Sequence, residues 1–374
     1  MRNKIIISVN STWNLVNFRS SLIHALHAQG YEIVAVSPPD KYVDKLLSLG
    51  VKYIPLSIDS KGVNPIADIF LFFRYLRIFL REQPDIYLSY TVKPNIYGSW
   101  AAHFFNVPVI NNIAGLGAIF IANGWLKRIV KQLYRVALSR SCHVFFQNDE
   151  DKDVFLDGIL SDGDKISVLP GSGIDLHHFS YTNRERSGSV VNFLLIARML
   201  WDKGVGEYVE AARILKSKYG NINFSLLGFV DVLNPSAISH DVVDSWEKEG
   251  VVTYLGATDD VRPFIINTDC IVLPSYREGT PRSLLEAAAM GRSIVTTAVP
   301  GCKDVVSHGV NGLLCQPRNI DDLVDKLEQV FLMSADARAE MGRMGRMMIE
   351  AKYDEKIVIS AYLSKINTLL HSTD

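Results

Sequence analysis

Cysteine is scarce in this sequence, and the cysteines present do not pair by spacing. They are scattered along the chain and form no C-x-x-C motif, standing at Cys142, Cys270, Cys302 and Cys315. No zinc site or disulfide framework can be read from this pattern, so a reducing cytosol is the expected compartment. The chain opens with MRNKIIISVN, whose apolar run suits a buried strand and is too short for a secretory signal.

An uncharged stretch from Val107 to Leu126 has the length of a membrane span but lacks the composition of one. Proline, asparagine and glycine interrupt it repeatedly, at Pro108, Asn111, Asn112, Gly115, Gly117 and Asn123. We therefore expect a strand, a loop and the start of a helix in this stretch.

Charged residues make up only 21% of the chain and hydrophobic ones 48%, which is typical of a globular protein. A chain of 374 residues is too long to fold around a single hydrophobic core, so two domains are expected. The net charge of −1 hides an asymmetry, because residues 1–140 hold 16 Lys/Arg against 7 Asp/Glu, a net charge of +9. The basic first half predicts an anionic partner: nucleic acid, anionic lipid or a phosphorylated substrate.

Short β-branched runs alternate with helical patterns along the chain, which predicts parallel α/β structure. The first series of expected strands covers residues 4–9, 32–36, 53–56, 86–89, 109–113 and 143–147. The second series covers residues 192–197, 223–227, 252–255, 270–274 and 293–297, and only helical patterns follow Asp321. We expect two Rossmann-like doubly wound domains, over residues 1–180 and 181–352, and a C-terminal helix over 353–374.

The stretch LPSYREGTPRSLLEAAAMG, residues 273–291, is the most informative one. A buried strand ends at Pro274, a loop carries Glu278 and Gly279, and a helix is expected from about Arg282 with Glu286 in its early turns. The glycine allows close approach of a ligand, and the helix start favours a diphosphate. Two carboxylates around this junction can accept hydrogen bonds from sugar hydroxyls.

A second motif lies upstream, in FLLIARMLWDKGVGEYVEAARIL. Arg198 and Lys203 follow the first strand of the second series, and the next helix is expected from about Gly204. Two cations beside a helix N-terminus would neutralise a diphosphate leaving group without a metal ion. Taken alone, this motif would be interpreted as two solvated loop cations.

Together the two motifs resemble the E-x7-E family of retaining glycosyltransferases, family 4 of that classification, which has the two-domain GT-B fold. The resemblance implies that Arg198 and Lys203 hold the donor diphosphate, that Glu278 contacts the donor sugar, and that Glu286 binds the ribose hydroxyls. The implied catalytic residues are thus Glu278, Arg198 and Lys203. It also places further donor-binding positions in loops near the nucleotide, at Gly279, Thr280, Pro281, Gly228 and Gly256.

The pattern is most similar to bacterial capsule, O-antigen and N-glycan enzymes that extend sugars on undecaprenyl diphosphate. ARMLWDKG is similar to enzymes that add N-acetylgalactosamine. The resemblance therefore implies transfer from a UDP-sugar to a hydroxyl of a lipid-linked glycan, with retention and across a cleft between the domains. A UDP-sugar 2-epimerase of similar fold and a non-catalytic sugar-nucleotide binder stay as alternatives.

The first half departs from the family pattern. Many relatives have a glycine-rich first loop and a histidine after the fifth strand, whereas this chain has STWNLVNFRSS and NNIAGLG. Candidates for the acceptor side are Asn17, Arg19, Asn112 and Gly115. The identity of a general base stays open.

Three other patterns receive structural interpretations. Asp151 and Asp153 fit a D-x-D metal motif, but Asn148 and the surrounding acids are typical of a helix cap and first turn. We therefore expect no metal and no other cofactor. PGSG at residues 170–173 is interpreted as an interdomain hinge, and His177 and His178 as structural loop residues.

Two basic amphipathic segments lie in the first half, over Asp68–Arg81 and Trp125–Arg140. They are either ordinary packing helices with solvated cations or contacts to an anionic membrane. The candidate membrane contacts are Arg74 and Arg77 in the first segment, and Lys127, Arg128, Lys131 and Arg135 in the second. In the second segment an apolar stripe is expected on the opposite face, formed by Leu126, Ile129, Val130, Leu133 and Val136. We expect a cytoplasmic protein held on the inner face of the cell membrane, without a nucleic-acid partner.

Overall fold

The computed structural model describes residues 3–59, 64–115, 125–160, 163–183, 190–232 and 234–371. Contacts divide the chain into two units, of which the first comprises Met1–Ser172 with Glu355–Asp374 and the second Gly173–Asp354. The sequence placed the first boundary near residue 180, eight residues further on. The C-terminal helix, α16 (Glu355–His371), belongs to the first unit.

The first unit contains a parallel sheet of seven strands in the order β3-β2-β1-β4-β5-β6-β7. Its strands are β1 (Lys4–Ser8), β2 (Glu32–Ser37), β3 (Lys52–Pro55), β4 (Ile86–Tyr90), β5 (Val109–Ile113), β6 (His143–Phe146) and β7 (Ile166–Val168). The central strands are continuous buried runs, as expected for a sheet covered on both faces.

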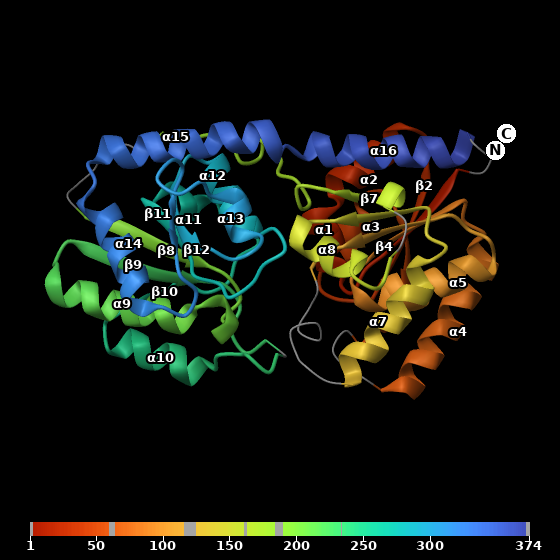
Figure 1. Cartoon of the computed structure of the whole chain (residues 1–374), viewed down its shortest axis with the longest axis horizontal. Helices are drawn as coiled ribbons and strands as arrows, with labels where there is room; N and C mark the ends of the chain where they lie inside the picture. Colours follow the sequence, from red (N-terminus) through yellow and green to blue (C-terminus); the bar gives the residue numbers. More distant parts are fainter. Residues whose placement is uncertain are drawn as a thin grey trace. The chain divides into compact units, whose positions relative to one another are not determined.

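Helices cover both faces of this sheet (Figure 1). One face packs against α1 (Thr12–Phe18), α2 (Ser20–Ala28), α3 (Val43–Leu47) and α16, with Leu15, Leu22, Leu46 and Tyr362 in the core. The other packs against α4 (Pro65–Glu82), η1 (Pro94–Gly98), α5 (Ser99–Phe104), α7 (Trp125–Leu138) and α8 (Asp149–Leu156).

The second unit contains a parallel sheet of six strands in the order β10-β9-β8-β11-β12-β13. Its strands are β8 (Val191–Ile196), β9 (Ile222–Leu227), β10 (Thr253–Tyr254), β11 (Cys270–Leu273), β12 (Ser293–Thr297) and β13 (Leu313–Cys315). One face packs against α9 (Val205–Lys218), α10 (His240–Lys248) and α14 (Ile320–Leu332). The other packs against α11 (Arg262–Ile266), α12 (Arg282–Ala289), α13 (Cys302–Val305) and α15 (Ala335–Lys352).

Two parallel, doubly wound α/β units are thus confirmed, and every expected strand is present within one or two residues. Helices α1 and α2 are separated at Arg19, whose φ of −131° is not helical. The uncharged stretch after Val107 contains β5 and the first residues of α7, and residues 116–124 lie outside the described part. None of the described helices combines the length and hydropathy needed to cross a bilayer.

Candidate functional site

The strand order of the second unit defines where a ligand site can form. Numbered along the chain, it is 3-2-1-4-5-6, so the connections from the two central strands, β8 and β11, lead to opposite sides. Such a reversal opens a crevice at the carboxyl ends of the two strands. Arg198 and Lys203 follow β8, and Glu278 follows β11, so the structure brings these three predicted residues to one edge of the sheet.

The loops after β8 and β11 are joined by direct hydrogen bonds. The carbonyl oxygen of Asp202 accepts from the backbone N–H of Tyr276 at 3.0 Å and from the hydroxyl of Ser275 at 3.3 Å. Gly204, with φ of +72°, lies so close to β11 that a Cβ atom would sit 2.1 Å from the carbonyl oxygen of Pro274. Only glycine fits there without displacing backbone. The helix expected from this glycine begins one residue later, at Val205.

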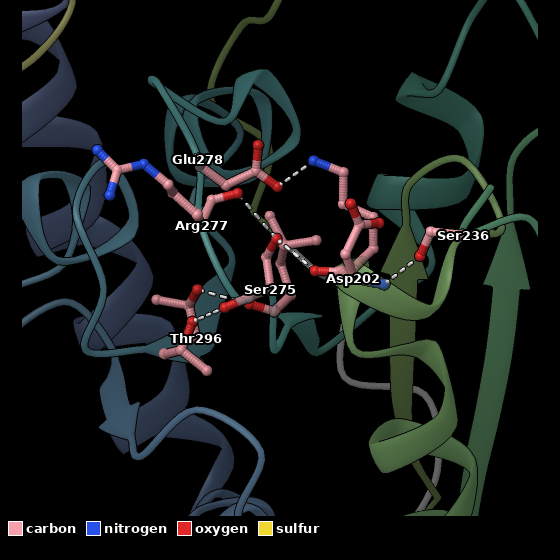
Figure 2. A network of polar contacts seen from close by, with 9 residues as sticks. Asp202, Ser236, Ser275, Arg277, Glu278 and Thr296 are labelled. Atoms are coloured by element: carbon pink, nitrogen blue, oxygen red, sulfur yellow. Dashed lines mark hydrogen bonds and ion pairs between the residues drawn. The ribbon is translucent and has the colours of Figure 1, made fainter. Parts of the chain in front are cut away.

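Lys203 and Glu278 form the central ion pair of the site. The Lys203 Nζ atom lies 2.5 Å from Glu278 Oε1, and the two side chains are 17% and 13% exposed. Figure 2 shows Glu278 at the end of this contact, with Ser275 and Asp202 beneath it. The two predicted residues therefore neutralise each other in the ligand-free protein.

Arg198 supplies a positive charge in addition to this neutral ion pair. It lies two residues beyond β8, and its side chain is exposed. Within the described part of the chain, its guanidinium has no hydrogen bond or ion pair. A free, planar donor group at the same edge of the sheet as this ion pair is suited to bind a phosphate oxygen pair.

Glu286 lies in the second turn of α12 and is buried. Its Oε1 atom accepts from Arg282 Nε at 2.9 Å. Burial raises the pKa of the Glu286 carboxyl, and the neighbouring Arg282 partly opposes that shift. The helix begins at Arg282 after Pro281, as the sequence predicts. Gly279, Thr280 and Pro281 form the intervening loop, which is partly exposed up to Thr280.

Gly228 and Gly256 are brought together by the ends of β9 and β10. The N–H of Gly228 donates to the carbonyl oxygen of Gly256 at 2.8 Å. A Cβ atom on Gly228 would lie 1.8 Å from the carbonyl oxygen of Ala197, immediately before Arg198, whereas one on Gly256 would meet open space. Gly228 thus packs against the end of β8, and Gly256 leaves the neighbouring surface open.

Two residues that position this site were missed from the sequence. Gly301, after β12, has φ of +80°, and a Cβ atom there would lie 2.0 Å from the carbonyl oxygen of Gly279. Ser236, after β9, accepts from Asp202 N at 3.0 Å through its hydroxyl (Figure 2), while its carbonyl accepts from Trp201 N at 2.8 Å. Gly301 could have been found from the sequence, because it stands in AVPGC directly after an expected strand. Ser236 could not, because its hydrogen bonds join residues far apart in the sequence.

The acceptor-side candidates in the first unit separate into two groups. Arg19 stacks on Tyr90, with its Cζ atom 4.2 Å from the ring centroid, and the Asn112 amide donates to Tyr362 at 3.0 Å. The Asn17 amide instead donates to the carbonyl of Trp13 within its own helix. Gly115 is the last residue described before a gap, and a Cβ atom on it would lie 4.0 Å from Asp151 Oδ2.

The helix-start interpretation of the D-x-D pattern is confirmed. Asn148 caps α8, accepting from the N–H of Asp151 at 2.7 Å, and Asp151 is buried in the first turn. Among the residues that the structure describes, no three His, Cys, Asp or Glu side chains are grouped as metal ligands.

The amphipathic interpretation of α7 needs a correction. Val130 is buried and Leu133 partly buried, but Ile129 and Val136 of the expected apolar stripe are 45% and 58% exposed. They share the exposed side with Arg128 and Arg135, while Lys127 and Lys131 are only partly exposed. The buried face is formed instead by Val130, Tyr134, Ala137 and Leu138. Leu126 lies where side chains are not described. On α4, Arg74 and Arg77 are exposed.

Comparisons with known proteins identify the family of this chain. Residues 191–332 match the family model of glycosyl transferases group 1, and residues 4–148 match the glycosyl transferase 4-like model. The chain is 31% identical over 367 residues to N,N'-diacetylbacillosaminyl-diphospho-undecaprenol alpha-1,3-N-acetylgalactosaminyltransferase of Campylobacter jejuni, covering 94% of each protein. It is 23% identical over 385 residues to the capsular polysaccharide biosynthesis glycosyltransferase CapM of Staphylococcus aureus, covering 100% of each.

Solved structures show the same fold. Anabaena HepE in complex with UDP and glucose has a TM-score of 0.78 and 14% sequence identity, covering 97% of this chain and 99% of that one. A glycosyltransferase of Rickettsia africae has a TM-score of 0.78 and 17% identity, covering 99% of each. Because both sheets, both family models and a relative spanning nearly the whole chain agree, this chain belongs to the family 4-like glycosyltransferases of GT-B fold.

Proposed function

We propose that this enzyme transfers a sugar from a UDP-sugar to a hydroxyl of a polyprenyl-diphosphate-linked glycan, with retention at the anomeric carbon. The best candidate for the sugar is an N-acetylhexosamine such as N-acetylgalactosamine. The observation that carries the proposal is the meeting of two features at the strand reversal of the second unit: the Lys203–Glu278 pair, and Arg198, which has no partner among the described residues. The printed activity of the Campylobacter jejuni relative supports the lipid-linked acceptor.

In this proposal the cationic residues bind the diphosphate and the carboxylates bind hydroxyl groups. Arg198 and one of the three Lys203 N–H bonds bind the donor diphosphate, while Lys203 keeps Glu278 in place through another. Glu278 accepts from a hydroxyl of the donor sugar, and the free oxygen of Glu286 accepts from the ribose. The bond from the anomeric carbon to the diphosphate breaks as the acceptor oxygen bonds to that carbon on the same face. The acceptor proton passes to the leaving diphosphate, whose developing charge the two cations stabilise.

The proposal is tested by a screen of UDP-sugars against lipid-diphosphate acceptors, read by mass spectrometry. We expect one pair to give an acceptor heavier by one sugar residue, together with stoichiometric UDP. A 2-epimerase would convert the donor without any acceptor, and a non-catalytic binder would bind UDP without turnover. Either of these two results would overturn the proposal.

A lipid-linked acceptor places the reaction at a membrane, and the outer face of α4 supports this. Five large apolar side chains of α4 are 55–65% exposed, namely Ile66, Ile69, Phe70, Phe73 and Leu80. Arg74, Arg77 and Arg81 of the same helix are also exposed. Apolar and cationic side chains along one exposed helix suit an anionic bilayer surface, since rings enter the headgroup layer while the arginines reach phosphates. The proposed location is the inner face of the cell membrane, where the protein is peripherally bound.

Replacing Arg74 and Arg77 by glutamate should weaken binding to phosphatidylglycerol-containing vesicles at least about tenfold, because each cation near such a surface contributes about 1 kcal/mol. Sedimentation with vesicles measures the effect, which should shrink in high salt. Phe70→Ser with Phe73→Ser should weaken binding at high salt as well. The matched control is Lys248→Glu with Lys352→Glu, which makes the same charge change at exposed positions of the second unit. Equal loss in control and test variants would contradict the contact.

A further inference from the structure

Arg19 is a buried arginine of the first unit that lacks a carboxylate partner among the residues that the structure describes. The residue is 5% exposed, and its Nη1 atom donates to the carbonyl oxygen of Phe18 at 3.1 Å. The guanidinium carbon lies 4.2 Å from the ring centroid of Tyr90. Among the described residues no carboxylate forms an ion pair with it, and its Nε atom is buried without a hydrogen-bond partner.

This arrangement is costly for the protein alone. A guanidinium has five N–H donors, and buried arginines are normally paired because removing the charge from water is unfavourable. A tyrosine ring and one carbonyl oxygen compensate only part of that loss. A buried group left so incompletely bonded requires an explanation, and an anionic ligand would supply the missing acceptors.

Two neighbouring strand ends contribute further unpartnered polar groups. Thr91 follows β4 directly, has φ of +65°, and its buried hydroxyl has no hydrogen-bond partner in the described part of the chain. This φ is strained for a β-branched residue, and such strain is often retained at binding sites. On β5, Asn112 donates its amide N–H to Tyr362, but no described residue bonds to its buried Oδ1 atom.

The topology puts these groups at the position where a ligand is expected. The first unit also has the order 3-2-1-4, so its connections reverse between β1 and β4. Tyr90 ends β4, and Arg19 reaches it from the break between α1 and α2, the connection that follows β1. The carboxyl ends of β1 and β4 are therefore the place in the first unit where a ligand is expected.

We infer that Arg19, supported by Thr91, binds a phosphate oxygen of the diphosphate that links the acceptor glycan to its lipid. The guanidinium provides the charge and paired N–H donors that phosphate requires, and the Thr91 hydroxyl donates to a second oxygen. This inference rests on the proposed lipid-linked acceptor. The donor diphosphate has its own cations, Arg198 and Lys203, in the second unit.

The decisive experiment compares two acceptors that carry the same glycan, one on a short-chain prenyl diphosphate and one on a neutral alkyl chain. Arg19→Lys should raise KM for the diphosphate acceptor roughly tenfold, because an ammonium replaces the fork of N–H donors. KM for the neutral acceptor and the Kd for UDP should stay within about twofold. An equal loss with both acceptors, or a loss of UDP affinity, would assign Arg19 a structural or donor role and overturn the inference.

A second variant guards against misfolding. Thr91→Val keeps the shape and removes a buried hydroxyl that no described residue bonds to, so the thermal unfolding temperature of the variant should not fall. It should still raise KM for the diphosphate acceptor while leaving the neutral one unchanged. If Thr91→Val leaves both KM values unchanged, the Thr91 contact is wrong.

Binding of inorganic pyrophosphate in the presence of saturating UDP provides a readout without turnover. Calorimetry should detect a second site in the parent protein that Arg19→Lys weakens about tenfold. If no acceptor is turned over but this binding is seen, the proposed reaction fails and the anion site stands. If transfer occurs but pyrophosphate does not bind, or binds equally to parent and variant, the anion site fails alone.

Discussion

Replacing Arg198 or Lys203 by alanine should each lower turnover on the order of 10²-fold or more. Both residues are proposed to stabilise charge that develops on the leaving diphosphate, and loss of one such contact typically costs that much. Arg198 has no protein partner among the described residues, so Arg198→Ala should leave the thermal unfolding temperature nearly unchanged. Steady-state kinetics with the best donor and acceptor measure the loss.

Lys203→Ala should have a second consequence. It leaves Glu278, whose side chain is only 13% exposed, without its partner and close to the donor diphosphate. The resulting repulsion should weaken UDP binding as well as turnover, and Glu278→Gln in the same chain should restore part of the UDP affinity. A double-mutant cycle on the two residues, followed by calorimetry, gives this coupling directly.

A chelator tests whether the reaction needs a metal ion. Activity of the parent should persist in EDTA, because the proposed charge stabilisation comes from protein cations alone. Lys248→Ala, at an exposed position of α10, is the control for loss of a positive charge and should retain full turnover. A strict requirement for magnesium or manganese in the chemical step, or full activity of Arg198→Ala, would contradict the assignment.

The second large effect is expected from substitutions of Glu278 and Glu286, which we propose have different roles. Glu278→Gln should lower kcat on the order of 10²-fold with little change in UDP affinity, since this residue positions the reacting sugar. Glu286→Gln should mainly weaken UDP binding, because a ribose contact exists in ground and transition states alike. Calorimetry with UDP and kinetics at saturating donor separate the two. The opposite result would show that the roles are reversed.

UDP affinity should also depend on pH through Glu286. Its pKa is raised by burial, so the carboxylate becomes protonated at a higher pH than an ordinary glutamate. Protonation removes the negative acceptor, so UDP affinity should fall as pH decreases through this raised pKa. The same titration of Glu286→Gln is the control, since it contains every other titrating group, including those of UDP. A parallel pH profile in parent and variant would exclude Glu286 as the cause.

Local patterns predicted most of the fold. Buried runs such as Val109–Ile113 and Ser293–Thr297 define strands because both faces of a parallel sheet are covered. β7 and β13 were not predicted, since each has three residues and takes its structure from pairing with a neighbouring strand. The break between α1 and α2 at Arg19 was not predicted, and the contact of Arg19 with Tyr90 joins residues far apart in the sequence.

Site residues could be predicted only where a strand, a loop and a helix follow one another directly in the sequence. Arg198, Lys203 and Glu278 were placed at strand ends, and the parallel order then brings those ends together. The exposure of Phe70 and Phe73 could not be predicted, because an apolar helix residue normally packs into a core.

The most direct test of the account is a crystal structure of the protein with UDP, grown without divalent cations. We predict the diphosphate at the carboxyl ends of β8 and β11, within hydrogen-bonding distance of Arg198 and Lys203, with the ribose hydroxyls on Glu286. Lys203 should still contact Glu278. A diphosphate bound elsewhere, or in this crevice without contact to either cation, would contradict the central claim.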